Sequence, residues 1–76
     1  MSVSIHPHAI VEPGAQLGRD VVVEAFSIVG AKAEIGDGCR VLHHSTVEGR
    51  VSMGKNNTVY PYAMIGGLTH DLKYQG

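Results

Sequence analysis

An aliphatic residue or methionine recurs at every sixth position along almost the whole chain. Eleven consecutive positions obey this rule, and none of them carries a polar or charged side chain. They are Ile5, Val11, Leu17, Val23, Val29, Ile35, Val41, Val47, Met53, Val59 and Ile65. A strict short period predicts a solenoid, in which each repeat buries its apolar residue only against neighbouring repeats.

A period of six does not fit a helix, whose apolar residues recur near every 3.6 residues. It fits the alternation of a strand, but one strand over residues 5–65 would far exceed the usual length of about 3–10 residues. The chain must therefore turn once in each six-residue repeat. We predict an all-β stack of short strands.

The other positions of the repeat, counted from the aliphatic residue as position one, have their own preferences. Position five is mostly small, and strand alternation turns it inward like position one. Position three holds all three prolines, Pro7, Pro13 and Pro61, which favour a turn there. Position two is often glycine, which we interpret as a bend with unusual backbone angles. These glycines are Gly18, Gly30, Gly36, Gly54 and Gly66.

This pattern resembles the hexapeptide-repeat proteins, in which three repeats form one triangular coil of a left-handed parallel β-helix. The resemblance implies a β-helix over residues 1–70 with about three and a half coils. Residues 18 apart would then stack at a strand spacing of about 4.8 Å. The last coil would expose an unpaired edge, so we expect the N-terminal portion of a longer protein or one protomer of an oligomer.

The repeat breaks where the next aliphatic residue is due, because that residue is Asp71. A carboxylate in the inward stack would be costly, so the chain should leave the coils near Gly66-Gly67. Residues 71–76 then begin an external loop. Such loops often carry function, although a solvated surface loop is the simpler interpretation.

The segment Gly66-Gly67, followed by Asp71-Leu72-Lys73-Tyr74 and Gly76, resembles the loop of the acyl-carrier-protein–UDP-N-acetylglucosamine O-acyltransferases. The opening Ile5-His6-Pro7 and the segment Phe26-Ser27-Ile28-Val29-Gly30 are similar to that family too. These transferases catalyse the first step of lipid A synthesis. The resemblance implies that the partners are UDP-N-acetylglucosamine and acyl carrier protein, and that the assembly is a homotrimer.

The family's loop also implies roles for three residues of the acceptor site. Asp71 matches an aspartate that contacts the sugar, and Lys73 matches a lysine at the rim. His70 stands beside this aspartate, where glutamine is frequent. The general-base histidine of the family would lie on coils downstream of this chain, so we expect no catalytic residue within it and no activity from it alone.

Charge and patterning exclude several other classes of function. The net charge is −1 with histidine neutral, which does not favour nucleic acid as a partner. No run of apolar residues is long enough to span a membrane. The first residues resemble no export signal, so we expect a cytoplasmic location. No motif indicates a cofactor, and we expect none.

Five histidines invite a metal or catalytic interpretation. His43 and His44 are adjacent, so in an extended strand they should point to opposite faces and chelate poorly. Some hexapeptide-repeat proteins, the gamma-class carbonic anhydrases, bind metal through histidines between subunits, but no second spaced histidine set matches them. We therefore expect no metal site.

The 18-residue spacing instead predicts an outward ladder of rings. It contains His8, Phe26, His44 and Tyr62. The ladder could stabilise the coils locally or form a subunit contact, and a catalytic His44 is a third possibility. Cys39, Ser27 and Ser45 occupy the inward position five, which favours packing over a role as nucleophile.

Two other functions remain open. A self-associating β-helix without catalysis is one, because the chain is short. A hexapeptide acyltransferase that uses acetyl-CoA or a different sugar nucleotide is the other, although the Asp71–Tyr74 segment argues against it.

Overall fold

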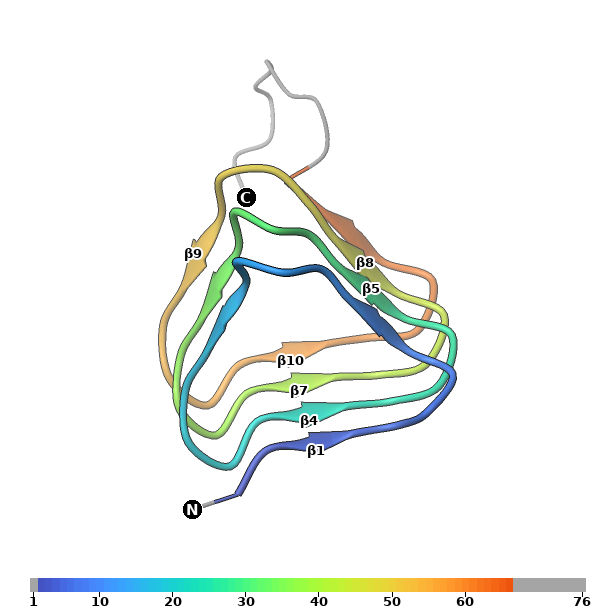
Figure 1. Cartoon of the computed structure of the whole chain (residues 1–76), viewed down its shortest axis with the longest axis horizontal. Coiled ribbons are helices and arrows are strands. Elements are labelled where there is room, and N and C mark those ends of the chain that lie inside the picture. The colour runs from blue at the N-terminus through green and yellow to red at the C-terminus, as the bar shows by residue number, and fades with distance from the viewer. Residues whose placement is uncertain (1, 67–76) are drawn as a thin grey trace.

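The computed structural model describes residues 2–66, which form a parallel β-solenoid of very short strands (Figure 1). Each strand has two residues, and the second is always the aliphatic residue of the repeat. The strands are β1 Ser4–Ile5, β2 Ile10–Val11, β3 Gln16–Leu17, β4 Val22–Val23, β5 Ile28–Val29, β6 Glu34–Ile35, β7 Arg40–Val41, β8 Thr46–Val47, β9 Ser52–Met53, β10 Thr58–Val59 and β11 Met64–Ile65.

Every third strand pairs in parallel, so the solenoid has three sides. The β1 sheet has the order β1-β4-β7-β10, the β2 sheet has the order β2-β5-β8-β11, and the β3 sheet has the order β3-β6-β9. The register joins residues 18 apart, as in the pairs Ser4 with Val22 and Ile5 with Val23. The described chain thus makes between three and four turns, in agreement with the prediction.

The winding of the chain is left-handed, as predicted. Figure 1 shows the chain passing counter-clockwise from the β1 sheet to the β2 sheet and then to the β3 sheet while it recedes from the viewer. Each corner between two sheets is a tight turn, and the three corners enclose a narrow triangular interior.

Positions one and five fill that interior, as the repeat predicts. Val29, Val41 and Val47 are fully buried at position one, and Val21 and Cys39 are fully buried at position five. Burial of these positions decreases at the two ends of the solenoid. Ile5, in the first coil, is 44% exposed, and Asn57, at position five of the last coil, is also exposed. No further described coil packs over Asn57.

The backbone corrects our interpretation of the position-two glycines. Of these five, only Gly66 has a positive φ. Two of the others are needed for space: a Cβ would lie 2.7 Å from the Asp37 backbone nitrogen at Gly18, and 2.6 Å from the Gly54 carbonyl oxygen of the next coil at Gly36. Position four carries the left-handed conformation instead. Its members with positive φ are Gly14, Asp20, Phe26, Gly38, His44, Asn56 and Tyr62.

The predicted boundary between residues 70 and 71 lies outside the described residues, and the last described strand ends at Ile65. Across residues 2–66 there is no helix with the length and apolar character needed to cross a membrane.

Candidate functional site

The three predicted acceptor-site residues, His70, Asp71 and Lys73, lie outside the described residues. The structure does describe Gly66, the residue that follows β11 on the way to them. Gly66 has a φ of 89°, and a Cβ there would run into the Glu48 carbonyl oxygen and come within 2.5 Å of Val51 Cγ2. Only glycine fits this point, because any other side chain would clash with the preceding coil.

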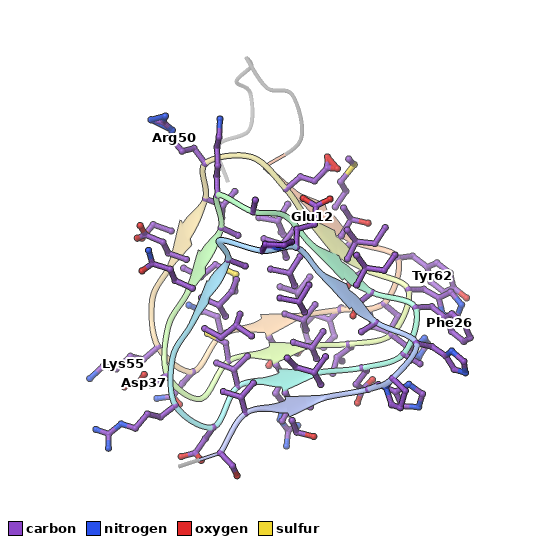
Figure 2. The ribbon with its side chains drawn as sticks, in the orientation of Figure 1. Glu12, Phe26, Asp37, Arg50, Lys55 and Tyr62 are labelled. Carbon is purple, nitrogen blue, oxygen red and sulfur yellow. The ribbon has the colours of Figure 1, made fainter. Side chains whose placement is uncertain are left out.

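Charged side chains gather at the corner that Gly66 belongs to, between the β2 and β3 sheets. We call this the Gly66 corner. Its exposed charged residues are Glu12, Lys32, Glu48 and Arg50; Figure 2 shows Glu12 and Arg50 at this corner. The Glu12 carboxylate accepts a hydrogen bond from the Ala31 backbone N–H at 3.2 Å.

Lys32 and Arg50 are the residues that sequence reasoning missed. They are 18 residues apart and therefore sit on adjacent coils, which is the same spacing that revealed the ring ladder. Within residues 2–66 their side chains form neither an ion pair nor a hydrogen bond. Both line a shallow hollow of about 340 Å³. Two neighbouring cations can bind an anionic group such as a phosphate.

A second shallow hollow at the Gly66 corner, of about 280 Å³, is lined by Glu12, Lys32 and Glu48. No histidine of the described residues lies at this corner. Histidine is the side chain best suited to remove a hydroxyl proton near neutral pH. The described part of this corner therefore offers charge for binding but no histidine base.

The described histidines lie at another corner, between the β1 and β2 sheets. We call it the ring corner; it comprises His6, His8, Phe26, His43, His44 and Tyr62. The predicted outward ladder is confirmed: Phe26 is 55% and Tyr62 75% exposed, and Figure 2 shows both projecting outward.

The ladder rings stack from coil to coil. The ring centroids are 5.4 Å apart for His8 and Phe26, 5.1 Å for Phe26 and His44, and 5.3 Å for His44 and Tyr62. The interplanar angles are 3°, 29° and 18°. His44 thus lies between two aromatic rings, at a different corner from Gly66.

The prediction that His43 and His44 diverge is wrong. Their Nδ1 atoms lie 3.0 Å apart, within hydrogen-bond distance. The reason is the backbone at His44, whose φ of 57° breaks the alternation of an extended strand. No cluster of three or more histidine, cysteine or acidic side chains suited to a metal ion occurs among residues 2–66.

The inward hydroxyl and thiol groups are buried and hydrogen-bonded, as their position predicted. Ser27 donates to the Glu24 carbonyl oxygen at 2.6 Å, and Ser45 donates to the Leu42 carbonyl oxygen at 2.5 Å. The Cys39 thiol is fully buried and lies 2.9 Å from the Gly54 carbonyl oxygen. None of the three can reach a substrate from this position.

Comparison with known proteins gives a consistent relationship. Over 73 residues, 96% of this chain, the sequence is 45% identical to the acyl-(acyl-carrier-protein)–UDP-N-acetylglucosamine O-acyltransferase of Chlamydia pneumoniae, covering 26% of that protein. The enzyme of the same description from Thermodesulfovibrio yellowstonii is 38% identical over 95% of this chain and 28% of its own length. The chain is homologous to part of these acyltransferases.

The acyltransferase relationship extends to the fold. The UDP-N-acetylglucosamine acyltransferase structure from Campylobacter jejuni matches with a TM-score of 0.85 and 37% identity, covering 93% of this chain and 28% of that one. The match supports the left-handed β-helix. No family model matches the chain. The chain spans about a quarter of the length of the acyltransferases it matches.

Proposed function

We propose that the chain forms part of an enzyme that transfers a 3-hydroxyacyl group from acyl carrier protein to the 3-hydroxyl of UDP-N-acetylglucosamine. The observation that carries this proposal is the 45% identity, over 96% of the chain, to an enzyme whose name gives both partners. Because the match leaves out only three of the 76 residues, an uninterrupted match takes in Asp71 and Lys73.

The proposed reaction is an acyl transfer from sulfur to oxygen. A histidine base takes the proton of the sugar hydroxyl while the oxygen attacks the thioester carbonyl carbon. The carbon–sulfur bond then breaks, and the carrier-protein thiolate leaves and is protonated. We assign the base to a part of the enzyme outside this chain, because the described histidines lie at the ring corner.

In this proposal Asp71 accepts a hydrogen bond from the sugar, Lys73 lies at the rim of the site, and His70 adjoins them. Two features of the Gly66 corner support this. The chain passes this corner at Gly66, where only glycine fits, and Lys32 and Arg50, which have no ionic partner among residues 2–66, stand on the neighbouring coils.

We further propose that the subunits assemble as a trimer through the outer face of the β2 sheet, and that the enzyme acts in the cytoplasm. Ile10 and Met64 on this face are 54% and 60% exposed, and Ile28 and Thr46 lie between them. The β3 sheet instead presents Gln16, Glu34 and Ser52. An exposed apolar face beside stacked rings is typical of a protein contact.

Substitution of Asp71 in the complete enzyme tests the proposed activity. We expect Asp71→Ala to lower kcat/KM for UDP-N-acetylglucosamine by about 10–100-fold, because the sugar loses a charge-assisted hydrogen bond. The measurement is steady-state transfer from 3-hydroxyacyl carrier protein. Lys55→Ala, at the corner between the β3 and β1 sheets, is the control. Full activity of the Asp71 variant would refute the assignment.

Sedimentation equilibrium measures whether the subunits form a trimer. Combined with a measurement of UDP-N-acetylglucosamine binding, it distinguishes the enzyme from the alternative, a self-associating module without catalysis. Met64→Glu should weaken the trimer, because it places a charge on the apolar face. The matched change Ser52→Glu on the β3 sheet should not. A trimer that binds no UDP-N-acetylglucosamine would favour the non-catalytic module.

A further inference from the structure

The closest approach between two histidine rings on the described surface belongs to His43 and His44. Their Nδ1 atoms are 3.0 Å apart, and their rings meet edge to face at 90°. Two imidazole nitrogens can share one proton at this distance only if one donates and the other accepts. In such a pair one Nδ1 directs a lone pair toward its neighbour.

We infer that His43 and His44 form a two-point binding site for a divalent transition-metal ion that prefers square-planar or tetragonal coordination, namely Cu²⁺ or Ni²⁺. Imidazole nitrogen is a common ligand of both ions. The inference depends on the spacing of the two nitrogens and does not rest on the acyltransferase activity.

The distance between the two Nδ1 atoms favours one coordination geometry over another. With metal–nitrogen bonds of about 2.0–2.1 Å, nitrogens 3.0 Å apart subtend roughly 91–97° at the metal. A tetrahedral zinc ion would instead require nitrogens about 3.3–3.4 Å apart. A right angle between neighbouring ligands is the arrangement that Cu²⁺ and Ni²⁺ favour.

Packing at the ring corner holds the two side chains in place before any metal arrives. The His44 ring lies between Phe26 and Tyr62, with centroid distances of 5.1 and 5.3 Å. The His43 ring meets the edge of Tyr62 at 6.2 Å, and its backbone N–H donates to Glu24 Oε1 at 3.0 Å. Such support lowers the entropy cost of binding.

The surroundings also suit a cation. His43, His6 and Glu24 line one shallow hollow of about 350 Å³ beside the pair. When the metal binds, the shared proton moves from one Nδ1 to Nε2 of the same ring. Binding to two neutral rings therefore releases no proton, whereas acid competes with the metal for the nitrogens.

Titration of the untagged full chain with Cu²⁺ alone, followed by electron paramagnetic resonance, tests the inference. We expect one tight site per chain with hyperfine coupling to two nitrogens, and Ni²⁺ bound more tightly than Zn²⁺. His44→Phe should weaken Cu²⁺ binding at least tenfold. This change is sterically matched, because Phe26 occupies the same repeat position with φ of 61° against 57° for His44.

His8→Phe is the control, since it removes another imidazole of the same ladder and leaves the pair intact. It should bind Cu²⁺ like the unaltered chain. Undiminished binding by His44→Phe would overturn the inference, provided that thermal unfolding shows both variants folded. The inference would also be overturned by a Cu²⁺ spectrum with coupling to only one nitrogen, or by equal losses of Cu²⁺ affinity in the two variants.

Discussion

The carboxylate of Glu24 accepts a hydrogen bond from the backbone N–H of His43, which lies nineteen residues further along the chain, at 3.0 Å. Glu12 and Ala31 repeat this relationship in the same register at another corner, at 3.2 Å. Both N–H groups sit in turns, where the strand ladders are interrupted. A position-two glutamate therefore ties one coil to the next through an N–H that has no backbone acceptor.

Loss of this tie should be measurable. We expect Glu24→Ala to lower the free energy of unfolding by about 1 kcal/mol, since the His43 N–H loses its protein partner. Glu24→Gln should lie between this variant and the original chain, because it keeps an acceptor without the charge. Denaturant unfolding measures the effect. Glu34→Ala, on the outer face of the β3 sheet, is the control and should be nearly silent.

Two position-two glycines in successive coils should respond oppositely to alanine. At Gly36 a Cβ would lie 2.6 Å from the Gly54 carbonyl oxygen, which is backbone and cannot move aside. We expect Gly36→Ala to cost about 1–3 kcal/mol. At Gly54 the nearest atom would be Asn57 Nδ2 at 3.7 Å, so Gly54→Ala should be neutral or stabilise by about 0.4–1 kcal/mol. Thermal melting of both variants measures the difference. Equal changes in stability would contradict the steric explanation.

The fold could be predicted because burial obeys the period of the sequence. Val29 and Val47 face the interior in a register set by the 18-residue coil, and nothing else in the sequence has to be known to place them. The backbone angles at the corners are a different matter. Phe26 and Tyr62 adopt a left-handed conformation that bulky side chains rarely take, whereas Lys32, at the same position of the repeat, does not.

Surface contacts could be predicted only where they depend on the repeat spacing and not on the backbone angles at the corners. The ladder from His8 to Tyr62 was predicted from the 18-residue spacing alone. The pair Lys32 and Arg50 has the same spacing and could have been predicted in the same way. The approach of His43 to His44 could not, because it depends on the φ of His44. Asp71 and Lys73 were proposed from resemblance, and their roles remain predictions.

The ring ladder should contribute coupling between neighbouring coils only. A double-mutant cycle with Phe26→Asn and His44→Asn should give about 0.5–1.5 kcal/mol, the value of a stacked ring pair. Asparagine suits both positions, because Asn56 holds the same repeat position with φ of 58°. A cycle between Phe26 and Tyr62, which lie two coils apart, should give a coupling near zero. Substantial coupling in the second cycle would mean that the rings act as one unit.

Cys39 should report on opening of the solenoid. Its thiol is fully buried and bonded to the Gly54 carbonyl oxygen, so we expect a thiol reagent to modify it only as fast as the coils unfold. The rate should rise steeply with denaturant. Rapid modification under native conditions would show that the coils around Cys39 open locally, and would revive a reactive role for the thiol.

The 18-residue register has a consequence for how the length of such a chain can change. An insertion of one residue would turn every later side chain out of its phase, exchanging interior for surface. Six residues inserted between Arg50 and Gly66 would preserve the interior but carry Gly66 to the next corner, away from Lys32 and Arg50. Only a gain or loss of a complete coil keeps each residue on its own corner. Length variation among working relatives of this chain should therefore come in steps of eighteen, or be confined to segments that leave the coils.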